Sequence, residues 1–265
     1  AGNETFPASG VGMTPLLLIT GFLGSGKTSL LRRVLPRLND AGLATHVVLQ
    51  DYVNAALDAA TLQDLCADVR RLSASCVCCD GEAALLDELG QCRLGERDVV
   101  LLEVSGTSDP LPLIELLLLD PVGRRYRPLR QVTVVDALRW QLRGSNDELE
   151  RMQARGATHV MFSWEDAVTA ERREAVRQAV AQLNPAARPV TDDELVEELV
   201  RTASSGSLDV QMLPAGGVIG RAWLAVSLRP HRHRHHELSH RFGARQIELP
   251  RRVSRAQLTG WLDAL

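Results

Sequence analysis

Short apolar runs alternate with amphipathic segments along the first 200 residues of the chain. The first run, at positions 16–19, ends directly in Thr20-Gly21, as a buried strand followed by a tight turn does. The next segment, 29–38, has leucine and valine at helical spacing. The same alternation predicts further strands at 46–49, 99–103, 132–135 and 158–162, and further helices at 57–71, 82–89, 111–119, 149–154 and 169–183.

This alternation predicts an α/β fold in which helices cover a mostly parallel sheet. We assign it to residues 14–202, after a small polar leader at 1–13. The sequence A-S-S-G-S opens a linker at 203–221. Residues 222–265 follow the order strand, strand, helix, which is too little to close a sheet. We therefore expect a partial, smaller α+β C-terminal domain there.

Residues 21–28, G-F-L-G-S-G-K-T, fit the P-loop pattern G-x-x-x-x-G-K-[ST] between a strand and a helix. Glycines let the backbone curl so that successive N–H groups face one anion, and the helix N-terminus adds its dipole. Lys27 would reach the β- and γ-phosphates, and Thr28 would ligate Mg²⁺. A chance match on a tight turn is the alternative. The predicted nucleotide-binding residues of this loop are Gly21, Gly24, Ser25, Gly26, Lys27, Thr28 and Ser29.

The charge composition singles out Lys27. The chain has 30 lysine and arginine residues, of which Lys27 is the one lysine, and 33 acidic residues give a net charge of −3. Arginine bias is typical of a GC-rich genome, whereas a phosphate site favours the compact ammonium over the planar guanidinium. No overall basic field exists for DNA or RNA, and the apolar runs are too short to span a bilayer. We expect no nucleic-acid and no membrane partner.

The strand at 99–103 ends in a carboxylate, and a glycine follows three residues later. In P-loop enzymes a carboxylate at this strand end meets Mg²⁺ through water, and the following glycine N–H can contact the γ-phosphate. Glu103 and Gly106 fit these two roles. The alternative is an ordinary junction between a strand and a turn.

Three of the five cysteines lie together in C-V-C-C at 76–79. Such thiols can bind one soft cation, Zn²⁺ or Co²⁺, and a shell one ligand short suits a carrier that releases its metal. A redox-active pair and incidental burial are the alternatives, and burial is expected for Cys66 and Cys92. The clustering and the absence of a signal-peptide pattern indicate the cytoplasm. The predicted metal ligands are Cys76, Cys78 and Cys79.

A P-loop followed by C-x-C-C and then E-x-S-G resembles the CobW-type metallochaperone GTPases of the CobW/HypB/UreG superfamily. The segments at 18–31, 76–79, 103–110 and 134–137 are similar to that family's motifs in their order. The resemblance covers about residues 14–200 and implies a P-loop NTPase fold, with GTP, Mg²⁺ and Zn²⁺ or Co²⁺ as ligands. The stretch from 50 to 58 is similar to the family's first switch, which implies a catalytic or Mg²⁺-shell role for Asp51.

The family's base-recognition motif N-K-x-D corresponds to Ser163-Trp164-Glu165-Asp166. Asp166 can accept hydrogen bonds from N1 and N2 of guanine, a donor pair that adenine lacks, and so favours GTP. Trp164 stands in place of the lysine that covers the base and could stack on the base instead. We expect a guanine preference, weakened by the loss of the asparagine and the lysine.

These features predict a GTPase that binds Zn²⁺ or Co²⁺ at the C-x-C-C motif and delivers the ion to a client protein in a nucleotide-dependent way. Lys27, Glu103 and Asp51 are its predicted catalytic residues, and nucleotide-dependent homodimerisation is left open. Five histidines at 231–240 could gather metal ions or form a solvated loop. His46 and His159, which flank strands, are expected to be structural.

Two other functions stay open on the sequence alone. The first is a P-loop ATPase or small-molecule kinase with structural cysteines. Comparing the binding of ATP and GTP would distinguish it from the predicted GTPase. The second is a metal sensor or buffer with negligible turnover, in which metal would bind without stimulating hydrolysis.

Overall fold

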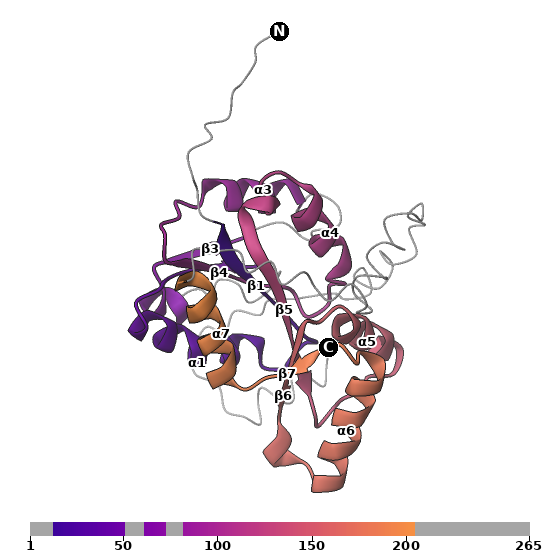
Figure 1. Cartoon of the computed structure of the whole chain (residues 1–265). Coiled ribbons are helices and arrows are strands. Elements are labelled where there is room, and N and C mark those ends of the chain that lie inside the picture. Colours follow the sequence, from indigo (N-terminus) through magenta and orange to yellow (C-terminus); the bar gives the residue numbers. More distant parts are fainter. Residues whose placement is uncertain (1–12, 51–60, 73–81, 205–265) are drawn as a thin grey trace, which may run out of the picture.

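A computed structural model describes residues 13–50, 61–72 and 82–204. Seven strands in these ranges form one parallel sheet in the order β3-β2-β4-β1-β5-β6-β7 (Figure 1). The strands are β1 (Thr14–Thr20), β2 (Ala44–Leu49), β3 (Asp68–Arg71), β4 (Asp98–Glu103), β5 (Tyr126–Asp136), β6 (His159–Ser163) and β7 (Arg188–Pro189). The α-helices are α1 (Lys27–Asp40), α3 (Glu82–Gln91), α4 (Leu111–Leu119), α5 (Asp147–Arg155), α6 (Ala170–Leu183) and α7 (Asp192–Ser204). None of the helices in this part of the chain has both the length and the apolar content needed to cross a membrane.

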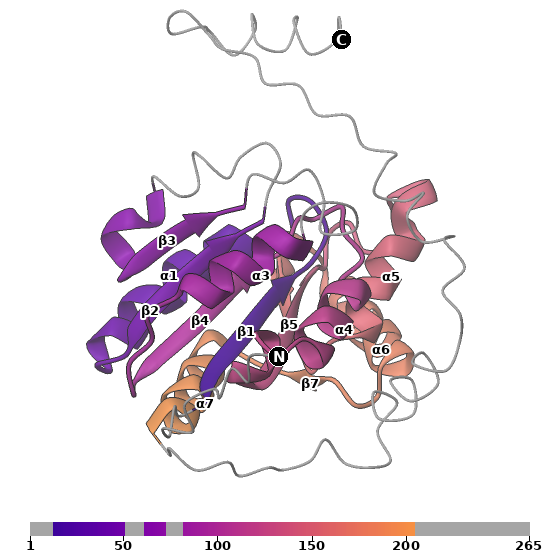
Figure 2. The ribbon, with the colours of Figure 1, turned by 90° about the horizontal axis from the view of Figure 1, so that it is seen from above.

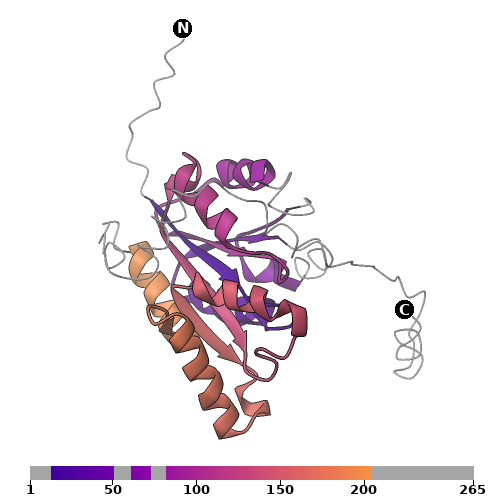
Figure 3. The ribbon, with the colours of Figure 1, turned by 90° about the vertical axis from the view of Figure 1, so that its right-hand side faces the viewer.

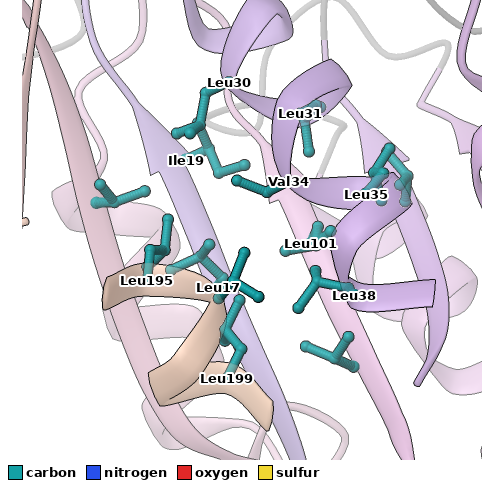
Figure 4. Packing of buried hydrophobic residues seen from close by; sticks show 14 of the residues in the cluster. Leu17, Ile19, Leu30, Leu31, Val34, Leu35, Leu38, Leu101, Leu195 and Leu199 are labelled. Carbon is teal, nitrogen blue, oxygen red and sulfur yellow. The ribbon is translucent and has the colours of Figure 1, made fainter. Parts of the chain in front are cut away.

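Helices cover both faces of the sheet because the buried strands are apolar on both sides. In β1, Leu17 and Ile19 pack on the face covered by α1 and α7, whereas Leu16 and Leu18 face α3 and α4. Figure 2 shows α1 and α3 on opposite sides of the strands, and Figure 4 shows leucines of α1 and α7 meeting β1 and β4. Figure 3 looks onto α5 and α6, which cover the β5–β6 end on the α4 side. The predicted α/β fold with a parallel sheet is confirmed.

The parallel strands bring the ends that carry the motifs to the same end of the sheet, at the carboxyl termini of β1, β4 and β6. β1 lies between β4 and β5, and its neighbours lead to opposite halves of the sheet. The register places Ile19 beside Glu103, and Thr20 beside Thr133. In parallel α/β sheets, ligands bind at the carboxyl ends of the strands where the order reverses. This arrangement, with the glycine-rich loop after β1, is the P-loop NTPase fold.

The helix predicted at 57–71 is wrong over most of its described part. Only the residues at 61–62 are α-helical, a short 3₁₀ helix η1 (Gln63–Leu65) follows, and the segment then forms β3. Leu62, Leu65 and Val69 pack in or against the core. Their positions three and four residues apart look like the buried face of a helix in the sequence. Pairing with β2, in which His46 is beside Asp68, makes the last four residues an edge strand instead.

The sequence prediction omitted β7 and α7. β7 is a two-residue edge strand that contains a proline, but α7 has Leu195, Val196, Leu199 and Ala203 buried along one face, which is a detectable helical pattern. Residues 203 and 204, where the linker was expected to begin, belong to α7. The rest of the linker and the expected C-terminal domain lie outside the described residues.

Glu198 of α7 joins the last helix to the sheet. Its carboxylate lies 3.1 Å from His159 Nε2 on β6 and accepts a 3.1 Å hydrogen bond from Arg130 Nε on β5. The contact with His159 chiefly, and that with Arg130, lower the pKa of Glu198 from 4.5 to about 2 against the opposing effect of burial. His159 therefore has the structural role expected from the sequence.

We expect Glu198→Gln to destabilise the protein at neutral pH more than in acid. A lowered pKa in the folded state means that the carboxylate stabilises the fold above pH 4.5, and that this contribution is lost as the pH falls from 4.5 towards 2. The free energy of unfolding should drop by about 1–2 kcal/mol at pH 7, and by less at pH 3. Urea unfolding at both pH values measures this, with the exposed Glu197→Gln as control. Equal losses at both pH values would contradict it.

Candidate functional site

The loop after β1 is shaped by three glycines with positive φ. Gly21 has φ +136°, Gly24 has φ +73°, and Gly26, the N-cap of α1, has φ +101°. Ser25 N–H donates to Phe22 O at 3.1 Å and closes the turn. Backbone with these angles favours glycine, so the spacing seen in the sequence is the spacing that the curled loop needs.

Lys27 lies beneath this loop. Its side chain is buried, and its Nζ donates to Gly21 O at 2.9 Å and to Phe22 O at 3.4 Å. Burying an ammonium is unfavourable unless its protons are hydrogen-bonded, and the loop carbonyls provide that. The charge is thus held at the centre of a backbone cradle at the N-terminus of α1, where an anion would be stabilised.

Thr28 and Glu103, predicted to share a metal, lie in contact. Thr28 Oγ1 donates to Glu103 Oε1 at 2.9 Å and lies 3.2 Å from Oε2. Glu103 ends β4 beside β1 and is buried. A hydroxyl and a carboxylate at this spacing are the oxygen donors that Mg²⁺ prefers, so the residues present fit that ion.

Gly106 lies against the P-loop. A Cβ atom on this residue would lie 2.7 Å from the backbone N of Leu23 and 3.0 Å from its Cα. Any side chain would therefore push the loop after β4 away from the loop after β1. The two segments predicted to contact the γ-phosphate are in direct backbone contact.

Ser163, the last residue of β6, and Trp164, which follows it, are attached to the P-loop by two side-chain hydrogen bonds. Ser163 Oγ donates to Ser25 O at 2.6 Å, and Trp164 Nε1 donates to Gly24 O at 3.3 Å. Trp164 has φ +58°, and half of its surface is exposed. Asp166 is exposed on the same short segment, the 3₁₀ helix η5 (Glu165–Ala167). The segment predicted to recognise the base thus lies beside the P-loop.

An ion-pair network below the P-loop was not predicted. Arg143 lies over the Phe22 ring, 4.4 Å from its centroid, and bonds Asp136 Oδ2 and Glu150 Oε1 at 3.0 Å each. Asp136 is fully buried and also accepts the N–H groups of the next turn. Burial raises the pKa of Glu150, against its hydrogen bonds from Gln141 and Arg143. Asp136 lies in the family motif at 134–137, V-V-D-A, but nothing in the local sequence points to Arg143 or Glu150.

The zinc or cobalt site predicted from the sequence falls on residues 76–79. Asp51, the thiols at 76–79 and the histidines at 231–240 lie outside the described residues. Within 13–50, 61–72 and 82–204, no three histidine, cysteine or acidic side chains are grouped closely enough to hold a metal ion.

The two isolated cysteines and His46 serve packing. Cys92 is buried and Cys66 is half-buried, and each thiol donates to a backbone carbonyl one turn earlier. Burial raises the pKa of both thiols, that of Cys66 to about 11, so they are protonated at neutral pH. The buried His46 bonds Asp98 Oδ2 at 2.9 Å. The packing expected for these residues is confirmed, with Cys66 only partly covered.

Comparison with known proteins gives a consistent picture. The family model of the CobW/HypB/UreG nucleotide-binding domain matches residues 15–191. The zinc chaperone YjiA of Escherichia coli (strain K12) is 27% identical over 203 residues, which are 74% of this chain and 59% of YjiA. The zinc-regulated GTPase metalloprotein activator 1 of Dictyostelium discoideum is 26% identical over 234 residues, 74% of this chain and 49% of that protein.

Among solved structures, the crystal structure of Zn(II)-bound YjiA GTPase from E. coli aligns with a TM-score of 0.48 at 22% identity, covering 67% of this chain and 57% of that one. The chain spans about half to three fifths of the length of these curated relatives. The family model matches well over half of the chain and includes the P-loop, Glu103, Gly106 and the segment after β6. The chain therefore belongs to the CobW/HypB/UreG family.

Proposed function

We propose that this protein is a GTPase that carries zinc and transfers it to a client protein. The observation that carries the proposal is the contact of Thr28 with Glu103 beside the buried Lys27, since it assembles a phosphate cradle and an oxygen-donor pair at one place. Family membership supports the same function.

Each residue at this end of the sheet has a separate role in the proposed reaction. The curled backbone and Lys27 would bind the β- and γ-phosphates, and Thr28 with Glu103 would hold Mg²⁺, which neutralises phosphate charge when bound. Asp51 remains our proposal for a further residue of this shell. The Gly106 N–H would contact the γ-phosphate, which links the loop after β4 to the nucleotide state.

Guanine selection is proposed to rest on Asp166. Ser163 has a single hydroxyl proton, and the 2.6 Å contact with Ser25 O uses it, so a donor to guanine O6 is not supplied there. Trp164, anchored to Gly24 O, presents a half-exposed indole on which a purine could stack. Stacking accepts either purine, which leaves the carboxylate of Asp166 as the group that discriminates.

Asp166→Asn is expected to change the preferred base. An amide can donate a hydrogen bond to the 2-oxo group of xanthine, whereas the carboxylate accepts from the 2-amino group of guanine. We expect GTP affinity to fall by about tenfold to a hundredfold and XTP affinity to rise, the scale of a bidentate base contact. Competition binding of GTP, XTP and ATP measures this, and Glu165→Gln is the control because Glu165 is paired with Arg177. An unchanged GTP preference in Asp166→Asn would contradict the assignment.

Zinc is proposed as the cargo because the relatives named above are a zinc chaperone and a zinc-regulated GTPase metalloprotein activator. Cys76, Cys78 and Cys79 are the proposed thiolate ligands, and Co²⁺ is a chemically similar second candidate. The cysteines lie in the sequence between Asp51 and Glu103. Ordering of the nucleotide loops would therefore be transmitted along the chain to the thiols, raising metal affinity, and hydrolysis would release the ion. Metal binding by these cysteines requires that they stay reduced, as thiols do in the cytoplasm, where we place the protein.

Visible absorption of Co²⁺–thiolate bands tests this coupling, and competition with Zn²⁺ extends it to the proposed cargo. We expect tighter metal binding with Mg²⁺ and a non-hydrolysable GTP analogue than with GDP. Cys78→Ser should abolish the bands, whereas Cys66→Ser, a partly buried thiol bonded to Leu62 O, should keep them. Identical metal affinity in both nucleotide states would contradict the coupling. Light scattering on the same samples reports whether nucleotide drives dimerisation.

A further inference from the structure

A buried side chain from α5 holds the loop that follows β4. Gln153 Nε2 donates to Gly106 O and to Ser108 O, at 3.1 Å each. The side chain is almost fully buried, with 1% of the residue's surface exposed. Because both groups that it faces are carbonyls, the amide must present its NH₂ end to them. Gln153 lies 47 residues from Gly106 in the sequence, so this is a tertiary contact and not part of a local turn.

The same residue is tied to the start of the P-loop. Its backbone carbonyl, in the last turn of α5, accepts from Gln131 Nε2 at 3.0 Å and Thr133 Oγ1 at 2.9 Å on β5. Gln131 Nε2 also donates to Thr20 Oγ1 at 3.1 Å, and Thr20 directly precedes Gly21. All four side chains of this set are buried and uncharged. Buried polar groups are costly to leave unpaired, so such a network fixes the relative positions of its members.

We infer that Gln153 is a positioning residue that sets the loop after β4 against the γ-phosphate position and thereby makes the site favour GTP over GDP. The inference rests on the proposed function. Gly106 is held by two contacts. The backbone of Leu23 lies so close that a Cβ on Gly106 would have no room, and the carbonyl of Gly106 accepts a hydrogen bond from the amide of Gln153. No acceptor among the described residues takes up the Gly106 N–H. Removing the amide frees the loop to move away from Leu23, and only a nucleotide with a γ-phosphate would lose a contact.

The test compares two buried amides, one that extends from α5 to the loop after β4 and one that binds the end of α5. Gln153→Leu removes the donor to the loop. The control, Asn184→Ala, removes a donor to three carbonyls near the end of α5, Ala154, Arg155 and Ala157, without touching the loop. Both variants should lose stability, because both leave buried carbonyls unpaired. Dissociation constants of GDP and of GppNHp, with Mg²⁺, are measured on the full chain well below each melting temperature.

We expect Gln153→Leu to weaken GppNHp binding about tenfold relative to GDP, the effect of one lost hydrogen bond, and to slow single-turnover hydrolysis. Asn184→Ala should leave the GppNHp-to-GDP ratio as in the wild type. Equal weakening of both nucleotides in Gln153→Leu, or the same ratio in both variants, would overturn the inference. If Gln153→Leu does not fold, Gln153→Asn, one methylene shorter, should shift the ratio in the same direction, and no shift there overturns it. A wild-type chain that binds neither nucleotide would instead refute the proposed function and, with it, the inference.

Discussion

Lys27→Ala is expected to remove measurable GTP binding while the protein still folds. Lys27 Nζ is held by Gly21 O and Phe22 O at the centre of the P-loop. A phosphate bound there would gain a charge-assisted hydrogen bond in a buried setting, so its loss should weaken binding about 100-fold or more, or ~3 kcal/mol. Isothermal titration with GDP and with a non-hydrolysable GTP analogue measures the loss. Metal binding in the nucleotide-free state should stay close to that of the wild type.

The Lys27→Arg variant sharpens this test. It keeps the positive charge but replaces a compact ammonium by a planar, forked group that cannot make the same contacts with two carbonyls and a phosphate. We expect it to bind nucleotide far more weakly than the wild type, which would account for a single lysine among 30 basic side chains. Circular dichroism is the control for both variants. Loss of the folded signal in Lys27→Ala would show that this residue is needed for the fold, against our assignment.

Gly21→Ala is expected to have the largest effect on stability. Gly21 has φ +136°, a region that residues with a Cβ rarely enter. An added Cβ would overlap Val134 O and lie 2.7 Å from Ser25 Oγ. Val134 is held in place because it is paired with Met161 of β6, and the preceding Thr133 is paired with Thr20 of β1. Backbone strain and overpacking together should lower the free energy of unfolding by about 3–5 kcal/mol.

Gly42→Ala is the matched control for that prediction. Gly42 also has a positive φ, +77°, but nothing lies within 4 Å of the position that its Cβ would take. Only the strain of a left-handed residue is added, about 1–2 kcal/mol. Urea unfolding of both variants separates the two contributions. Similar losses for the two glycines would mean that the contact with β5 is unimportant.

The candidate site could be predicted where its residues form a short motif in the sequence. Lys27 and Thr28 follow from the P-loop pattern, and Glu103 from a carboxylate at the end of an apolar run. The structure brings Thr28 and Glu103 to 2.9 Å, as their predicted shared role requires. Asp166 was identified through its family motif, and its role stays a prediction, as do those of Asp51 and the thiols at 76–79.

The remaining parts of the site depend on partners far away in the sequence. The family motif relates Ser163 and Trp164 only to the base, yet both donate to carbonyls of the P-loop, 138 and 140 residues away. Gln153 gave no sequence signal, because an isolated glutamine on an amphipathic helix is ordinary. Its position against Gly106 became visible only once α5 was packed on the sheet.

The sequence by itself determined the fold class and the phosphate loop of this protein. Apolar runs of strand length and leucines at helical spacing are local patterns, and the glycine spacing of the P-loop encodes a local backbone shape. The tertiary structure decided that residues 68–71 form a strand, that Glu198 meets His159, and that Gln153 meets Gly106. The physical reason is that strand register and helix packing set these contacts. Both depend on the free energy of the whole packed sheet, which no single segment of the sequence encodes.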